Sequence, residues 1–131
     1  MPPSSERADT PLRWLQNAQA DLALARIPLP RGVTYEQLCF HAQQAAEKAI
    51  KAVLLKCGID FPFTHNLQAL LDLLPKQITL PLALMEVVGL TPYAVATRYP
   101  GEAEPVTEQE YREAIGIAES VLAWAESIIQ P

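Results

Sequence analysis

Four polar side chains of one predicted helix, residues 34–58, carry groups that can bind a phosphate or move a proton. His41, Gln44, Lys48 and Lys51 fall within about 80° of one another when successive residues turn by about 100°. Lysine ammonium groups attract phosphate, and an imidazole can act as a general acid or base near neutral pH. The same stripe also fits a solvent-exposed face or a polar seam between two subunits, and the residues alone leave these alternatives open.

A second group of side chains with binding chemistry lies further along the chain, at the end of another predicted helix. Arg98 presents a planar fork of donors that matches a phosphate, and Tyr99 or Tyr93 offers a flat ring on which a base can stack. Alternatively, Arg98 stabilises the C-terminal turn of its own helix and pairs with Glu102 or Glu104. The sequence does not decide between these roles.

The motifs of most enzyme and metal sites are absent. No Gly-rich phosphate loop, His-Glu-x-x-His sequence, nucleophile elbow or Cys-x-x-Cys pair occurs. The two histidines, His41 and His65, have no partner at the spacing of metal ligands, and His65 is expected to make only a local hydrogen bond at a helix start. The acidic residues fall on predicted surface faces. The sequence therefore predicts neither a metal nor a cofactor.

The central helix that holds the stripe has clear ends and an apolar face. Thr34, with Gln37 in capping-box position, starts it, and Gly58 is suited to end it. Its apolar sector consists mainly of small residues, which allow a neighbouring helix to come close. These residues are Leu38, Ala42, Ala45, Ala46, Ala49, Ala52 and Val53.

Apolar periodicity and proline punctuation predict the other helices. The predicted starts are Asp9 or Thr10, Thr34, Thr64–Asn66, Pro81 and Thr107. The helix from Pro81 is expected to kink or break at Thr91-Pro92, to continue from Tyr93 to Tyr99 and to end at Pro100-Gly101. No segment alternates with the period of a strand. The fold class is therefore all-α: residues 1–8 form a flexible tail, and residues 9–131 form an up-and-down antiparallel bundle of four long helices plus one short helix.

Charge and composition exclude several classes of protein. The 131-residue chain carries 15 acidic and 10 basic residues, a formal net charge of −5, which argues against non-specific nucleic-acid binding but permits one local basic groove. The first residues lack the apolar region of a signal peptide, and no stretch is apolar enough to span a membrane. Cys39 and Cys57 flank the central helix, too far apart for a disulfide. Free thiols are typical of a cytoplasmic protein.

Three stretches together resemble the HEPN domain family (higher eukaryotes and prokaryotes nucleotide-binding). They are His41–Ala49, Thr64–Leu67 and Tyr93–Gly101, in the family's order and spacing. The resemblance extends from about Leu12 to Ile129. It implies an all-α bundle, usually a homodimer, and a small cytoplasmic prokaryotic protein often encoded beside a minimal nucleotidyltransferase.

The resemblance also implies an activity to consider. In such pairs the HEPN protein can be a metal-independent RNase toxin and the transferase its antitoxin. The RNase members carry an Arg that is followed four to six residues later by a His. Here Arg98 matches the Arg, but no His follows His65, so His41 or Glu102 would have to replace it. This departure argues against an enzymatic activity.

The sequence as a whole predicts a HEPN-type nucleotide- or RNA-binding protein that is the partner of a minimal nucleotidyltransferase in a toxin–antitoxin-like pair. The expected ligand-binding residues are Arg98, Tyr99, His41, Lys48 and Lys51, and the candidates for catalysis are Arg98 and His41. Two alternatives stay open. One is a metal-independent RNase that uses Arg98, and the other is a non-catalytic helical dimer that acts only as an interaction scaffold.

Overall fold

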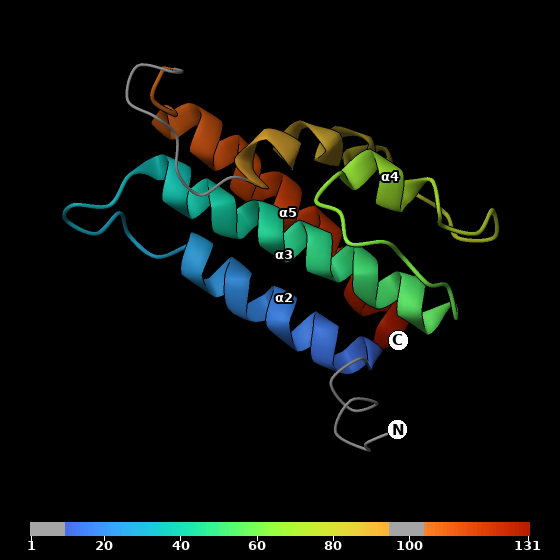
Figure 1. The fold of residues 1–131 in the computed structure, drawn as a ribbon. Coiled ribbons are helices and arrows are strands. Elements are labelled where there is room, and N and C mark those ends of the chain that lie inside the picture. The colour runs from blue at the N-terminus through green and yellow to red at the C-terminus, as the bar shows by residue number, and fades with distance from the viewer. Residues whose placement is uncertain (1–9, 95–103) are drawn as a thin grey trace.

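The computed structural model describes residues 10–94 and 104–131, which form five helices (Figure 1). They are α2 (Pro11–Ala25), α3 (Tyr35–Lys56), α4 (Leu67–Leu71), the 3₁₀-helix η1 (Leu82–Ala94) and α5 (Glu108–Ile129). No strand occurs among these described residues, and none of their helices is long and apolar enough to cross a membrane. The predicted all-α fold, with four long helices and one short helix, is confirmed.

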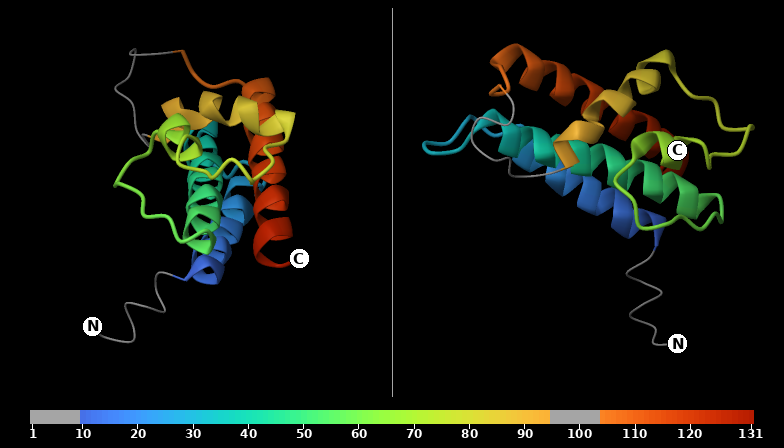
Figure 2. Two further views of the ribbon diagram at one scale, coloured as in Figure 1. Left: turned by 90° about the vertical axis from the view of Figure 1, so that its right-hand side faces the viewer. Right: turned by 45° about the horizontal axis from the view of Figure 1, so that its top comes forward.

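Helix α3 lies at the centre of the molecule and contacts each of the other described helices. Helix α2 runs antiparallel to α3, and α5 runs in the same direction as α3 after η1 has brought the chain back (Figure 1 and Figure 2). The chain therefore runs up and down as predicted. Because α3 is covered from several sides, most of its side chains must be apolar or must find partners inside the protein.

The three long α-helices begin at the predicted caps. Thr10 caps α2 with its side chain, and Pro11 is the first helical residue. At the start of α3, the backbone N–H of Thr34 donates to Gln37 Oε1 at 3.1 Å. Thr107 begins α5 with a full capping box, in which its Oγ1 accepts from the backbone N–H of the third helical residue at 3.1 Å. These bonds satisfy backbone donors that a helix start leaves unpaired.

Helix α3 ends at a glycine that adopts a left-handed conformation. Gly58 has a φ of 73°, its N–H donates to the Leu55 carbonyl at 2.9 Å, and the N–H of Ile59 donates to the Leu54 carbonyl at 2.9 Å. This pair of bonds is a Schellman motif, which glycine favours because it has no Cβ. Cys57, just before it, is a free thiol, as predicted.

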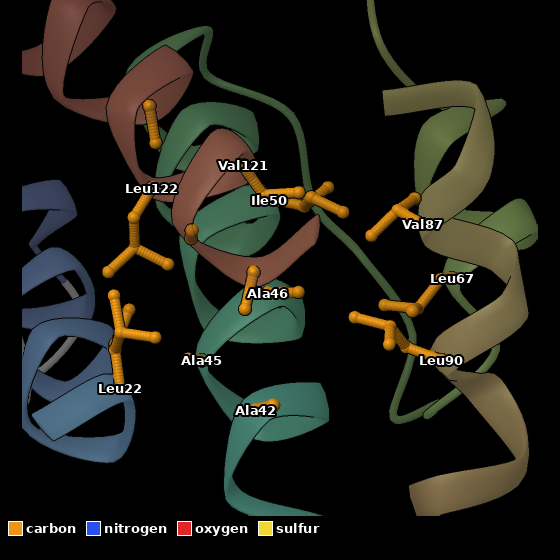
Figure 3. Packing of buried hydrophobic residues seen from close by; sticks show 14 of the residues in the cluster. Leu22, Ala42, Ala45, Ala46, Ile50, Leu67, Val87, Leu90, Val121 and Leu122 are labelled. Atoms are coloured by element: carbon orange, nitrogen blue, oxygen red, sulfur yellow. The ribbon is translucent and has the colours of Figure 1, made fainter. Parts of the chain in front are cut away.

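The predicted apolar sector of α3 forms the middle of the core (Figure 3). Its seven residues, Leu38, Ala42, Ala45, Ala46, Ala49, Ala52 and Val53, are all at most 3% exposed. Leu22 of α2 and Val87 of η1 approach α3 from opposite sides in Figure 3. The small side chains let these helices pack closely against α3.

The fourth long helix differs from the prediction in type. Residues Leu82–Ala94 form one 3₁₀-helix that continues through Pro92 and is not broken at Thr91-Pro92. In a 3₁₀-helix each N–H bonds to the carbonyl three residues earlier, so Pro92 removes a single bond from the run. The predicted continuation to Tyr99 and the stop at Pro100-Gly101 lie outside the described residues, as does the predicted tail.

Candidate functional site: two buried carboxylates on the central helix

The polar stripe of α3 does not form one continuous cationic surface. Its first half is tied to α2. His41 Nδ1 lies 3.0 Å from Asp21 Oδ1, and Lys48 Nζ donates to Asp21 Oδ2 at 2.6 Å. Asp21 is only 8% exposed. One buried carboxylate therefore bridges His41 and Lys48 and offsets the positive charge in this part of the stripe.

The second half of the stripe is tied to a different carboxylate, that of Glu47. Lys51 Nζ donates to Glu47 Oε2 at 2.9 Å, Gln43 Nε2 donates to Oε1 at 2.9 Å, and His65 Nδ1 lies 2.8 Å from Oε1. Glu47 is 3% exposed and Lys51 is 6% exposed. Gln44 borders this group because its amide donates to Gln43 Oε1 at 2.6 Å. We call Gln43, Glu47, Lys51 and His65 the Glu47 cluster.

The burial of Asp21 and Glu47 corrects the expectation that the acidic residues lie on surface faces. The sequence carried a signal for both positions. Asp21 stands beside Leu22 and three residues after Ala18, on the inward face of α2, and Glu47 stands four residues before Lys51, where helical side chains meet. A buried carboxylate is costly unless it is paired and hydrogen-bonded. The stripe supplies those partners.

Both histidines are held by a buried carboxylate in the same way. A carboxylate only accepts hydrogen bonds, so Nδ1 carries the proton in His41 and in His65, and Nε2 of the neutral ring is left as an acceptor. The side chain of His41 is 34% exposed, and that of His65 is 62% exposed. The expectation of a purely local hydrogen bond for His65 is wrong, because its partner lies on α3.

Aromatic rings cover the ammonium group of Lys51. Its Nζ lies 5.6 Å from the centre of the Trp14 ring and 5.3 Å from that of Phe61, and the two rings meet edge to face at 5.7 Å. Cations are attracted to the faces of such rings. Phe63, two residues beyond Phe61, is fully exposed. The charge of Lys51 is therefore used inside the protein, against Glu47 and the rings.

Comparison with known proteins identifies the fold that carries these clusters. The HEPN domain family matches residues 12–128. The chain belongs to the HEPN domain family. It is similar to two crystal structures: TT1696 from Thermus thermophilus, with 34% identity and a TM-score of 0.80 over 92% of this chain and 99% of that one, and ST0689, an archaeal HEPN homologue, with 30% identity and a TM-score of 0.70 over 90% and 96%. No curated protein shows a significant match.

The described part of this HEPN domain separates the residues predicted to bind a ligand. His41 and Lys48 are brought together on Asp21, whereas Lys51 belongs to the Glu47 cluster. Arg98 and Tyr99 lie outside the described residues. Tyr93, the alternative stacking ring, is partly buried against the core. Within residues 10–94 and 104–131, no group of three or more His, Cys, Asp or Glu side chains is placed to hold a metal.

The chain on both sides of Arg98 is anchored to neighbours of the Glu47 cluster and to the start of α3. The backbone N–H of Leu67, two residues after His65, lies 3.4 Å from Thr91 Oγ1. On the other side, the backbone N–H of Val106 donates to Glu36 Oε1 at 3.0 Å. A fully extended chain from Thr91 to Arg98 spans at most about 25 Å. This tether limits how far Arg98 can lie from α3.

The Glu47 cluster predicts an acid-dependent loss of stability. Burial by itself would raise the pKa of Glu47, but the hydrogen bonds from Gln43, Lys51 and His65 outweigh it and hold the pKa below its ordinary value of 4.5. The folded state therefore binds the proton less readily than the unfolded state does. This contribution is complete above the unfolded pKa and is lost as the pH falls through the folded pKa.

Urea unfolding at pH values from 7 to 3 measures this effect. The free energy of unfolding of the wild-type protein is expected to fall below about pH 4.5, and Glu47→Gln, which cannot ionise, is expected to fall less steeply. The difference between the two curves isolates Glu47 from the other carboxylates. Parallel curves would mean that the cluster does not hold Glu47 in its charged form.

Proposed function

We propose that this HEPN domain binds a nucleotide or an RNA phosphate, with Arg98 as the principal cation and Tyr99 as the ring against which a base stacks. The observation that supports this most strongly is the family match over residues 12–128, which includes the Arg98 motif. A guanidinium can make two parallel hydrogen bonds to a phosphate, and an aromatic ring can stack with any base. On a chain with a net charge of −5, a local site of this kind is needed to hold an anion.

The residues of the stripe contribute to this site in different ways. Lys48 has a side chain that is 27% exposed, and an ammonium group has three donors, so one bond to Asp21 leaves donors for a phosphate. His41, on the other oxygen of Asp21, offers Nε2 to the same ligand. Lys51 acts indirectly, because it is buried and holds Glu47 in place. Arg98 therefore carries most of the affinity in this proposal.

The proposed context is a cytoplasmic homodimer that pairs with a minimal nucleotidyltransferase in a toxin–antitoxin-like system. The support for it is the family resemblance and, for the cytoplasm, the two free cysteines. Light scattering of the purified chain tests the dimer. Co-purification with a nucleotidyltransferase encoded beside it tests the partner.

A thermal-shift titration with ATP, other nucleotides and a short single-stranded RNA tests ligand binding. A ligand at about 100 times its Kd should stabilise the folded state by roughly 2.7 kcal/mol, which raises the Tm by several degrees. If none of these ligands changes the Tm, the scaffold alternative is favoured, and the search turns to protein partners.

A metal-independent RNase is the second candidate, and the Glu47 cluster favours it more than the sequence did. His65 is an exposed imidazole whose Nδ1 is held by a buried carboxylate, an arrangement that suits a general base. It offers an alternative to the His that is missing after Arg98. Cleavage of RNA in EDTA that is lost in both Arg98→Ala and His65→Ala, but kept in His41→Ala, would establish this activity. RNA that is bound but never cut would exclude it.

A further inference from the structure

A pocket at the turn between α2 and α3 is distinct from the two carboxylate clusters. Its volume is about 410 Å³, and its lining consists of six apolar side chains and two polar ones, Gln37 and His41. Leu24 and Ile27, which belong to the apolar lining, are 47% and 38% exposed. A mostly apolar hollow of this size with a few polar groups is typical of a site for a small molecule. A ligand seated there would remove these two side chains from water.

The two polar side chains of the pocket converge, because Gln37 and His41 are four residues apart on one helix. Each already uses one of its polar atoms. His41 Nδ1 donates to Asp21, and Gln37 Oε1 accepts from the backbone N–H of Thr34 at 3.1 Å. Within the described part of the chain, this leaves an acceptor, His41 Nε2, and a donor, the Gln37 amide nitrogen.

We propose that this pocket binds a small apolar alcohol or phenol. A hydroxyl group is both a donor and an acceptor, so it can donate to His41 Nε2 and accept from the Gln37 amide at the same time. A carboxylate would bring only acceptors to the lone pair of His41 Nε2, and a hydrocarbon would leave both polar atoms without a partner. Asp21 positions the ring, because its carboxylate fixes the proton on Nδ1.

This site goes beyond the phosphate site proposed above, although both use His41. The apolar lining comes from α2, α3 and the loop between them, and it includes no residue of the segment that carries Arg98. Arg98→Ala should therefore leave the binding of a phenol unchanged. Loss of nucleotide binding with phenol binding intact would separate the two sites.

Two probes of equal shape, 4-ethylphenol and 4-ethyltoluene, test the inference by NMR titration at pH 8. The phenol is expected to bind about fivefold more tightly, the size of one net neutral hydrogen bond. The ¹⁵N resonance of His41 Nε2 should move when the phenol binds and stay in place with 4-ethyltoluene. Equal affinity for the two probes, or resonance changes confined to other parts of the molecule, would overturn the proposal.

Variants of the two polar side chains complete the test. His41→Ala should abolish the preference for the phenol, whereas His65→Ala, which removes the other carboxylate-held histidine, should preserve it. Because His41→Ala also removes a partner of Asp21, Gln37→Met provides an independent check, and it should reduce the preference in a folded protein. An unchanged preference in both His41→Ala and Gln37→Met would show that neither side chain reads the hydroxyl.

Discussion

Replacement of Glu47 by alanine is expected to lower the free energy of unfolding by about 3–5 kcal/mol. Lys51 is 6% exposed, and its described ion-pair partner is Glu47. Without this carboxylate, a buried positive charge would lose its counter-ion, and the donors of Gln43 and His65 would lose their common acceptor. Urea unfolding measures the loss, which for a domain of this size corresponds to a fall in Tm of about 10–20 °C.

A matched control separates burial from charge. Glu119 also pairs with a cation, Arg26, at 3.0 Å, but both side chains are about half exposed, so Glu119→Ala should have little effect on stability. The double variant Glu47→Gln/Lys51→Met should be more stable than Glu47→Ala, since it removes the charge that would be stranded. Equal and small losses for Glu47→Ala and Glu119→Ala would contradict the described burial of the cluster.

Replacement of Arg98 by alanine is expected to weaken nucleotide or RNA binding by roughly a hundredfold. The estimate rests on two hydrogen bonds to a charged phosphate, which together contribute about 3 kcal/mol. At a ligand concentration that stabilises the wild-type protein by roughly 2.7 kcal/mol, the variant would be stabilised by only about 0.4 kcal/mol. The thermal-shift titration therefore detects the loss directly.

The control for Arg98→Ala is Arg112→Ala, which changes the net charge equally. Arg112 lies on α5, its side chain is 68% exposed, and its partner is Glu108 of the same helix. This variant should bind the ligand as the wild-type protein does, unless binding depends only on total charge. If Arg98→Ala instead lowers the Tm without ligand and leaves the ligand-induced shift unchanged, Arg98 is a structural cation.

The two carboxylate clusters change how the conserved chemistry of the stripe should be tested. Single lysine variants of Lys48 or Lys51 would alter a buried ion pair as well as a surface charge. Their effects on binding therefore need a stability measurement beside them. Arg98 and Tyr99 are the better first variants for function, and Lys51→Met belongs with the stability experiments.

The sequence alone determined the helical scaffold. The caps at Thr10 and Thr107, the glycine at position 58 and the small residues of α3 act within a few residues of themselves, so their roles could be predicted from local spacing. The apolar sector of α3 was correct in every residue because a helix repeats its faces with a fixed period. The family resemblance was also carried by short stretches in order.

Only the tertiary structure decided how the polar side chains pair. Asp21 and His41 come from different helices, and His65 reaches Glu47 from the connection before α4, so no local spacing reveals either contact. A charged side chain on a helix has the same periodicity whether it faces water or a buried partner. The neighbouring elements set its burial, and through burial they decide whether the charge is free for a ligand or already neutralised inside the fold.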